Sequence, residues 1–320
     1  MRYLATLRMF KLDTYLGWRV DFASPPGAPA YSGPDSVSWR VFKNPIALGV
    51  GGAAAVVLEF ADARIRTGVW EHSNYRADPI GRSTRTAMAA MIGVYGPQEA
   101  AQRIIRGVNN MHARVEGRTP SGERYRALDT ELLSWVSATA QWGFLNAYHR
   151  FVTPLSVAEQ ERFYDEGAPI AQLFGVETPI RSNAQFDALR ARLQPRFEPH
   201  PIVHEFLGIF SSGPGAMGVP ARLRQAMARA AISLLPGDVR ARLDLGPRYD
   251  LSPMERRVLR CLGAISERTP ILSAPPAQAS LRMGLPADFL YRSRPAQTRA
   301  LARWARRYPE RAAPTATYAR

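Results

Sequence analysis

Residues 74–117 read NYRADPIGRSTRTAMAAMIGVYGPQEAAQRIIRGVNNMHARVEG, and this stretch predicts two consecutive helices. The first is expected to begin with Asp78 as its N-cap and Pro79 as its first helical residue, where the missing N–H of proline costs nothing. It is expected to end near Gly96. Its apolar face recurs at helical spacing and consists of Met88, Met91, Ile92 and Tyr95.

The second helix is expected to run from Pro97 to about Arg114. Its apolar positions, again at helical spacing, are Ala101, Ile104, Ile105, Val108, Met111 and Val115. His112 lies four residues after Val108, so it falls on the edge of this buried face. An inward histidine is more often a hydrogen-bonded core residue than a ligand, and the pattern alone favours the core residue.

Three polar side chains crowd one side of the first helix. Arg82 and Thr86 are four residues apart, and Arg85 follows Arg82 by three, so they are neighbours on the helix surface. The small residues Ala89 and Gly93 continue that side. One helix therefore carries two arginines and a threonine over small residues, and the next carries one inward histidine.

A helix rich in glycine and alanine is expected further upstream. Asn44 and Pro45 are typical of its N-cap and first residue, and the run LGVGGAAAVVLEFADARI follows from residue 48. Each glycine weakens a helix, so three of them in one helix make sense where another backbone or a flat ligand approaches closely. Helix packing is the commoner cause of such a pattern.

The remaining chain predicts further helices. Asp129 is expected to cap a helix that is apolar nearly all round, which is typical of a central buried helix. Three capping boxes mark later helix starts, at Ser156 with Glu159, Ser182 with Gln185, and Ser252 with Glu255. Ser38 to Phe42 is open to two readings, a short strand or the approach to a helix. Strand–helix alternation and internal repeats are absent from the sequence, so the fold class is expected to be all-α, a single multi-helix domain of about ten helices.

The chain is strongly basic. Its 320 residues carry a net charge of 42 − 27 = +15 and are 46% apolar, enough for a large core. Such a charge can serve nucleic acid, an anionic membrane surface or an anionic ligand. The arginines are spread along the chain, and the sequence has no zinc-finger spacing, RNP-like string or P-loop. The positive charge is therefore better explained by arginines on solvated helix faces than by nucleic-acid binding.

One cysteine, Cys261, excludes a disulfide framework and a thiolate metal cluster. Its neighbours Val258, Leu259 and Leu262 predict a core position for it. The basic N-terminal residues lack a continuous apolar signal region, and the longest apolar run, residues 46–58, is too short to span a bilayer. A cytoplasmic protein is expected, and the arginine-rich residues 295–320 are compatible with peripheral membrane contact.

Several motifs together resemble the DUF2236 family, which comprises the MpaB oxygenases and the latex-clearing rubber oxygenases. They are R-x-x-R-T at 82–86, Tyr95-Gly96, MHARVEG at 111–117, GERYRALDTELLSWVSATA at 122–140 and the PLS…ERFYDEG segment at 154–167. The resemblance covers roughly residues 44–245, and its order and spacing are more specific than any one motif. It implies an all-α, globin-like fold that holds a b-type haem and oxidises hydrophobic substrates. In the rubber oxygenases this chemistry is cleavage of isoprenoid C=C bonds by dioxygen.

The resemblance changes the interpretation of His112. The family's iron-ligating histidine corresponds to this residue, and a neutral imidazole on an apolar helix face suits a proximal haem ligand. We therefore expect His112 to bind iron and Arg82 and Thr86 to lie near the haem. The second ring nitrogen of His112 should donate a hydrogen bond, and Asn109 or its carbonyl region is a candidate acceptor.

Arg85 departs from the rubber oxygenases, which carry a lysine able to cap the distal iron. An arginine stays charged and has no free lone pair, so it cannot ligate. Arg85 is the candidate catalytic residue if it donates hydrogen bonds to dioxygen in the pocket. Pairing with a haem propionate, or plain solvation, carries equal weight. This difference argues against rubber itself as the substrate.

The expected function is a haem b-dependent oxygenase that uses dioxygen on a hydrophobic small molecule, with oxidative cleavage of an isoprenoid as the specific candidate. Two alternatives are a non-enzymatic haem sensor or carrier, and a cofactor-free basic helical protein that binds an anionic surface. The expected organisation is an irregular lead-in at 1–36, the haem-binding helical domain at 37–294 and a basic helix or tail at 295–320.

Overall fold

Helices form most of the chain that the computed structural model describes, which comprises residues 14–15, 18–19, 21–212 and 219–308. The α-helices are α1 (Val37–Phe42), α2 (Pro45–Phe60), α3 (Ala63–His72), α4 (Pro79–Tyr95), α5 (Gln98–His112), α6 (Thr130–Phe151), α7 (Val157–Leu173), α8 (Asn183–Leu193), α9 (Pro201–Ser212), α10 (Ala221–Leu234), α11 (Gly237–Arg242), α12 (Pro253–Ser266), α13 (Pro275–Arg282) and α14 (Arg294–Arg307). Short 3-10 helices lie at Gln194–Arg196, Pro247–Tyr249 and Phe289–Tyr291. The strands form two short antiparallel pairs, β1 (Thr14–Tyr15) with β2 (Trp18–Arg19) and β3 (Glu116–Arg118) with β4 (Arg124–Arg126).

The predicted all-α single domain is confirmed, and the expected number of helices is corrected. The described residues contain fourteen α-helices where about ten were expected. The excess comes partly from short helices such as α1 and α11, six residues each, whose length is too small to show a helical period. The segment from Ser38 to Phe42 belongs to α1, so it is neither a short strand nor only the approach to a helix, but a short helix of its own. Most of the basic N-terminal stretch and the end of the tail lie outside the described residues.

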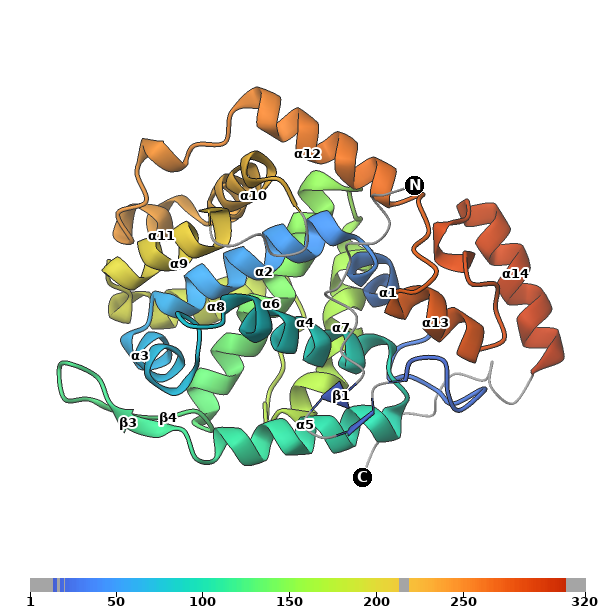
Figure 1. Ribbon diagram of the computed structural model, residues 1–320, viewed down its shortest axis with the longest axis horizontal. Coiled ribbons are helices and arrows are strands. Elements are labelled where there is room, and N and C mark those ends of the chain that lie inside the picture. The colour runs from blue at the N-terminus through green and yellow to red at the C-terminus, as the bar shows by residue number, and fades with distance from the viewer. Residues whose placement is uncertain (1–13, 16–17, 20, 213–218, 309–320) are drawn as a thin grey trace.

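Helices α2 and α6 cross at the centre of the molecule, and their backbones touch (Figure 1). A Cβ atom added to Gly51 of α2 would lie 2.7 Å from the carbonyl oxygen of Gly143 in α6. Such a distance leaves no room for a side chain, so both positions need glycine. The close approach predicted from the glycine-rich run is confirmed, and another helix is the element that approaches.

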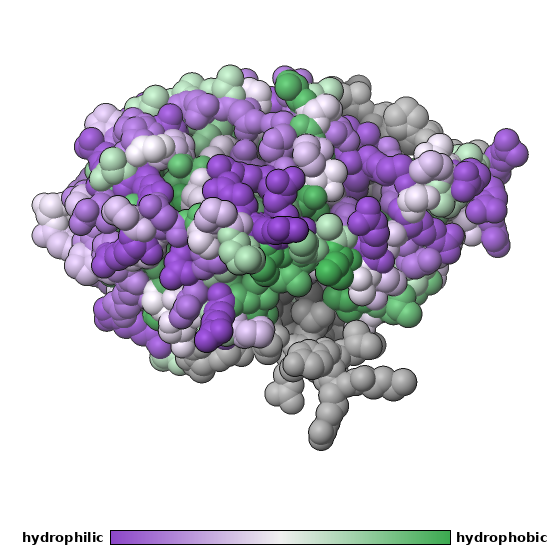
Figure 2. Space-filling model, turned by 90° about the horizontal axis from the view of Figure 1, so that it is seen from above, coloured by the Kyte–Doolittle hydropathy of each residue, from purple (hydrophilic) through white to green (hydrophobic). Residues whose placement is uncertain are grey.

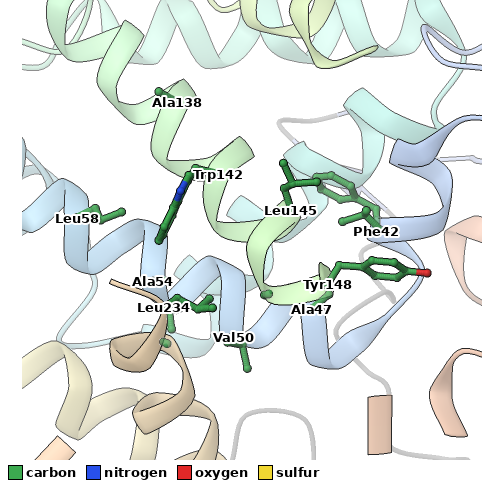
Figure 3. Close-up of a cluster of buried hydrophobic side chains, with 14 of the residues drawn as sticks. Phe42, Ala47, Val50, Ala54, Leu58, Ala138, Trp142, Leu145, Tyr148 and Leu234 are labelled. Atoms are coloured by element: carbon green, nitrogen blue, oxygen red, sulfur yellow. The ribbon is translucent and has the colours of Figure 1, made fainter. Parts of the chain in front are cut away.

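The two helices run antiparallel, and side chains fill the space beside the glycine contact. The indole Nε1 of Trp135 in α6 donates a hydrogen bond of 3.1 Å to the carbonyl oxygen of Leu58 in α2. Figure 3 shows Leu58 and Trp142 extending between the helices, with Leu234 of α10 closing the cluster from below. Leu58, Trp135 and Leu145 are fully buried, so α6 is the central buried helix that its composition predicts.

The caps of α2, α4 and α6 form as predicted. Asn44 accepts hydrogen bonds from the amides of Ile46 and Ala47, and Asp129 accepts them from Glu131 and Leu132. Asp78 accepts from Gly81 at the start of α4, with Pro79 at the first helical position. These side chains satisfy amides that the first helical turn leaves without partners. Of the three predicted capping boxes, those of Ser156 and Ser252 are complete.

The third capping box is only half formed. Ser182 accepts from the amide of Gln185, but the Gln185 side chain accepts from the amide of Arg181 instead of returning to Ser182.

Two buried positions were also predicted wrongly. Met111 is 43% exposed because α5 buries only the face that carries Ile104 and Val108.

Cys261 is exposed, which corrects its predicted core position. Helix α12 turns only one face inward, through Leu259 and Gly263, and Cys261 lies on the other side. A Cβ added to Gly263 would lie 2.5 Å from the carbonyl oxygen of Phe151, so α12 lies directly on the end of α6. An apolar neighbourhood in sequence therefore does not place a helix position in the core.

A buried ion pair joins the start of α2 to the C-terminal helices. Lys43 Nζ lies 2.9 Å from the Glu267 carboxylate and donates 2.5 Å and 3.0 Å hydrogen bonds to the carbonyl oxygens of Leu290 and Glu267. Burial lowers the pKa of Lys43, while Glu267 raises it. Each Lys43 proton thus has an acceptor, so a buried ammonium group is tolerated at this junction.

We predict that Gly51→Ala lowers the free energy of unfolding by about 2–3 kcal/mol, because the new methyl group would overlap the backbone of α6. Gly52→Ala is the matched control. Its Cβ would meet only the ring of Phe144, at 3.7 Å, so stability should stay equal or rise by up to about 1 kcal/mol. Urea denaturation followed by circular dichroism measures both, and equal stabilities of the two variants would contradict the proposed contact.

Candidate functional site

His112 is the last residue of α5, and its ring nitrogens have no hydrogen-bond partner among the described residues. Its Nδ1 atom is buried. Burial lowers the pKa of His112, and the positive charge of Arg82 lowers it further. The imidazole is therefore neutral at neutral pH and keeps a lone pair available. An unpartnered buried nitrogen is costly in a folded protein, so its presence indicates a missing partner.

A surface pocket of about 390 Å³ lies beside His112. The residues that line it come from the end of α5, the β3–β4 hairpin and the start of α6; they include Val115, Arg126, Leu128 and Thr130. In Figure 1 this hairpin extends from the end of α5 and returns the chain to α6. The hairpin thus brings the start of the central helix next to His112.

The predicted hydrogen bond between His112 and Asn109 is not made. Asn109 Nδ2 donates instead to the carbonyl oxygen of Leu173 in α7, at 2.8 Å. Asn109 Oδ1 and His112 Nδ1 are both buried without a partner. The amide of Asn109 is thus held in place by α7 while its oxygen stays available to an N–H donor.

Arg82 and Thr86 are brought together as predicted. The guanidinium of Arg82 donates to Thr86 Oγ1, and Thr86 Oγ1 donates to the carbonyl oxygen of Arg82 at 3.2 Å. The charge of Arg82 also lowers the pKa of three other groups, His112, Glu59 and Tyr75, while burial is the main influence on each. The positive charge of Arg82 therefore acts on titratable groups from α2, α5 and the α3–α4 loop at once.

Arg85 lies apart from this group. Its side chain is 44% exposed and forms a 3.5 Å ion pair with Asp78, the N-cap of its own helix. The structure therefore brings together Arg82, Thr86 and His112 but directs Arg85 toward the helix N-terminus. An exposed pair of this kind contributes little to stability, so Arg85 is free to exchange partners.

Glu59 is a candidate site residue that the sequence reading missed. It lies near the end of α2, and its Oε1 accepts a 3.2 Å hydrogen bond from Thr139 of α6. Burial raises the pKa of Glu59 to about 7, although the Thr139 hydrogen bond and the Arg82 charge oppose the rise. A carboxyl group with this pKa can both give and take a proton near neutral pH. The available signal was a lone carboxylate inside an otherwise apolar, glycine-rich helix.

No group of three or more His, Cys, Asp or Glu side chains is placed to hold a metal ion in the part of the chain that the structure describes. The polar groups of the site are instead one neutral imidazole, one carboxyl group of raised pKa and one arginine on an all-helical frame. Such a set suits an enzyme in which a bound group does the redox chemistry and the protein supplies a ligand and a proton donor.

The comparison with protein families agrees with this class. Residues 39–268 match the family described as ER-bound oxygenase mpaB/B'/rubber oxygenase, catalytic domain, and the chain belongs to that family. The protein is thus an enzyme of the oxidoreductase type, an oxygenase. The resemblance read from the motifs is confirmed, and the match extends beyond the 44–245 expected from them.

No curated protein and no solved structure matches the chain. Among the described residues, no helix has both the length and the apolar character needed to cross a membrane.

We predict that Glu59→Gln changes how stability depends on pH. A carboxyl group whose folded pKa rises from 4.5 to about 7 stabilises the fold fully below pH 4.5 and loses that contribution as pH rises to about 7. Glutamine resembles the protonated acid and can still accept from Thr139. Relative to the variant, the wild type should therefore lose roughly 1–3 kcal/mol between pH 5 and about 8.

Urea unfolding at a series of pH values measures this difference. Glu177→Gln, at an exposed carboxylate, is the control and should follow the wild type across the series. A wild type and a Glu59→Gln variant whose stabilities run parallel from pH 5 to about 8 would show that Glu59 has no raised pKa.

Proposed function

We propose that this oxygenase holds haem b through His112 and uses dioxygen to oxidise a hydrophobic small molecule, with isoprenoid C=C cleavage as the specific candidate reaction. The observation that carries the proposal is the neutral, half-buried imidazole of His112, whose buried Nδ1 atom has no partner, in a member of this oxygenase family. A porphyrin iron needs one axial nitrogen from the protein, so it does not require a cluster of protein ligands.

The residues around His112 fit a haem. At this end of α5, His112 Nδ1 and Asn109 Oδ1 are both buried without a hydrogen-bond partner, so each can still bond to a bound group. Arg82 supplies a positive charge beside the imidazole, which would offset a propionate. When bound, the haem would supply the activation of dioxygen, and the chain's own residues would bind, orient and move protons.

Each site residue then has a distinct role. Thr86 fixes the guanidinium of Arg82, so Arg82 and Thr86 support the cofactor and do not react. Glu59 carries a proton that it can exchange at neutral pH, with Thr139 orienting its carboxyl group. Arg85 is the candidate donor to dioxygen, and it reaches that position only by leaving Asp78. If it stays with Asp78, it remains on the exposed surface at the start of α4.

The remaining proposals concern the reactants, the partners and the location. A hydrophobic small molecule and dioxygen are the proposed reactants, a nucleic acid is not a proposed partner, and the proposed location is the cytoplasm.

Helix α14 buries Trp304, whose Nε1 donates to the carbonyl oxygen of Met283, and exposes Arg303 and Arg306. The apolar side of α14 is thus used by the fold, and only its basic side is available for peripheral contact with an anionic membrane.

We predict that His112→Ala folds but retains less than about a tenth of the wild-type haem, because removing the axial nitrogen removes the bond that holds the iron. His204→Ala is the control, since His204 lies on α9 and interacts with Tyr249. The Soret absorbance per polypeptide and the bound iron are the measurements, with far-ultraviolet circular dichroism to verify folding. Stoichiometric haem with an unaltered spectrum in His112→Ala would exclude this ligand.

We also predict that the resting ferric protein is mainly high-spin. Arg85 cannot ligate because a guanidinium has donors only and stays protonated. Arg85→Lys should introduce a low-spin form at alkaline pH, where a lysine amine can lose its proton. The ferric absorption and EPR spectra of both proteins across a pH series decide the matter. A nitrogen-ligated, low-spin wild type at neutral pH would refute this account of the distal side.

A further inference from the structure

Helix α12 exposes an apolar stripe on the outside of the molecule. Met254 is 69% exposed, Val258 42% and Ile265 60%, and the exposed Cys261 lies between the last two. Their spacing of four, three and four residues places all of them on one side of the helix. Isolated exposed apolar residues are ordinary, but a continuous line of them along one helix indicates a contact surface.

The fold does not need this stripe. The opposite side of α12 buries Leu259 and packs Gly263 against the carbonyl oxygen of Phe151. Figure 1 shows α12 running along the upper edge of the molecule, and Figure 2 looks onto that side, where hydrophobic atoms lie among hydrophilic ones. The stripe therefore faces solvent because the inner side of α12 already supplies the packing.

Arginines follow one border of the stripe. Arg257 and Arg260 are exposed, and both line a pocket with Cys261. Neither forms an ion pair with a carboxylate among the residues that the structure describes. Two positive charges one helical turn apart, beside an apolar stripe, thus remain unneutralised.

The acidic residues of this helix turn inward. Glu255 completes the capping box at the start of α12 and pairs with Arg229 at 2.5 Å. Glu267, just after the helix, pairs with the buried Lys43 at 2.9 Å. The exposed side of α12 is consequently apolar and positive, without an acidic residue to repel an anionic surface.

We propose that α12 lies in the plane of an anionic lipid bilayer, with Met254, Val258, Cys261 and Ile265 among the upper acyl chains and Arg257 and Arg260 on the phosphates. An in-plane amphipathic helix uses this division, because apolar burial and attraction to anionic headgroups add. The long arginine side chains can reach upward while their stems stay along the apolar side. The chain's net charge of +15 favours the same surface.

A second copy of the chain fits this surface less well. Two α12 faces packed together would place Arg257 and Arg260 of one chain near the same residues of the other, and the exposed side of α12 has no acidic residue to offset them. A bilayer of anionic lipid offers both an apolar layer for the apolar stripe and negative charge for the two arginines. The inference concerns this face alone and does not depend on the cofactor or the reaction.

Cys261 makes a direct test available, because it is the only cysteine in the sequence and lies within the stripe. A polarity-sensitive fluorophore on this thiol should shift to the blue with vesicles of phosphatidylcholine and phosphatidylglycerol. Nitroxide labels placed high on the acyl chains should quench it more than labels placed deep. Vesicles of phosphatidylcholine alone, or high salt with the anionic vesicles, should weaken both responses.

Sedimentation of the unlabelled protein with the same vesicles measures the partition coefficient. Arg257→Gln with Arg260→Gln should lower it about ten- to thirtyfold. The control removes two charges elsewhere, by Arg106→Gln with Arg124→Gln at exposed positions of α5 and β4, which lie along the lower edge in Figure 1. Ile265→Glu should lower partition by roughly tenfold or more, whereas Leu281→Glu, at an exposed leucine of α13, should change it little.

The outcomes separate the candidate occupants. Reduced partition in both α12 variants, with little change in both controls, supports the membrane face. Equal losses in the α12 and control charge variants would overturn it in favour of diffuse attraction to the whole basic surface. Wild-type dimers that Ile265→Glu dissociates, seen by light scattering in the absence of a fluorophore response to vesicles, would overturn it in favour of a second copy.

Discussion

The contact between the backbones of Gly51 and Gly143 is the constraint on which the rest of the structure depends. It sets how closely α2 and α6 approach, and that separation lets Trp135 reach the carbonyl oxygen of Leu58. The same crossing brings Thr139 within hydrogen-bond distance of the Glu59 carboxyl group. The glycine contact therefore supports both the packing and the site, because side chains at these positions would move α6 away from the Leu58 carbonyl oxygen and the Glu59 carboxyl group.

The features that the sequence predicted well depend on near neighbours. The caps at Asn44, Asp78 and Asp129 are decided within a few residues, so the starts of three helices were predictable. Arg82 and Thr86 meet because they are one turn apart on a helix. The close packing of the glycine-rich helix was predictable, but its partner was not, since Gly143 is far away in sequence.

The errors concern which side of a helix another element covers. Met111 and Cys261 sit in apolar stretches, yet both are exposed because α5 and α12 are covered on one side only. Glu59 was missed for a related reason, since its raised pKa depends on burial by distant segments and not on its neighbours. The direction of Arg85 likewise follows from its pairing with Asp78, which spacing alone did not single out.

The charge of Arg82 links the two titratable groups of the site. Burial disfavours the charged form of each group, so it lowers the pKa of His112 and raises that of Glu59. Arg82 lowers both values. It therefore reinforces the neutral imidazole but restrains the rise at Glu59. One arginine thus favours a histidine with a free lone pair and a carboxyl group that still exchanges its proton near pH 7, and Thr86 holds that arginine in place.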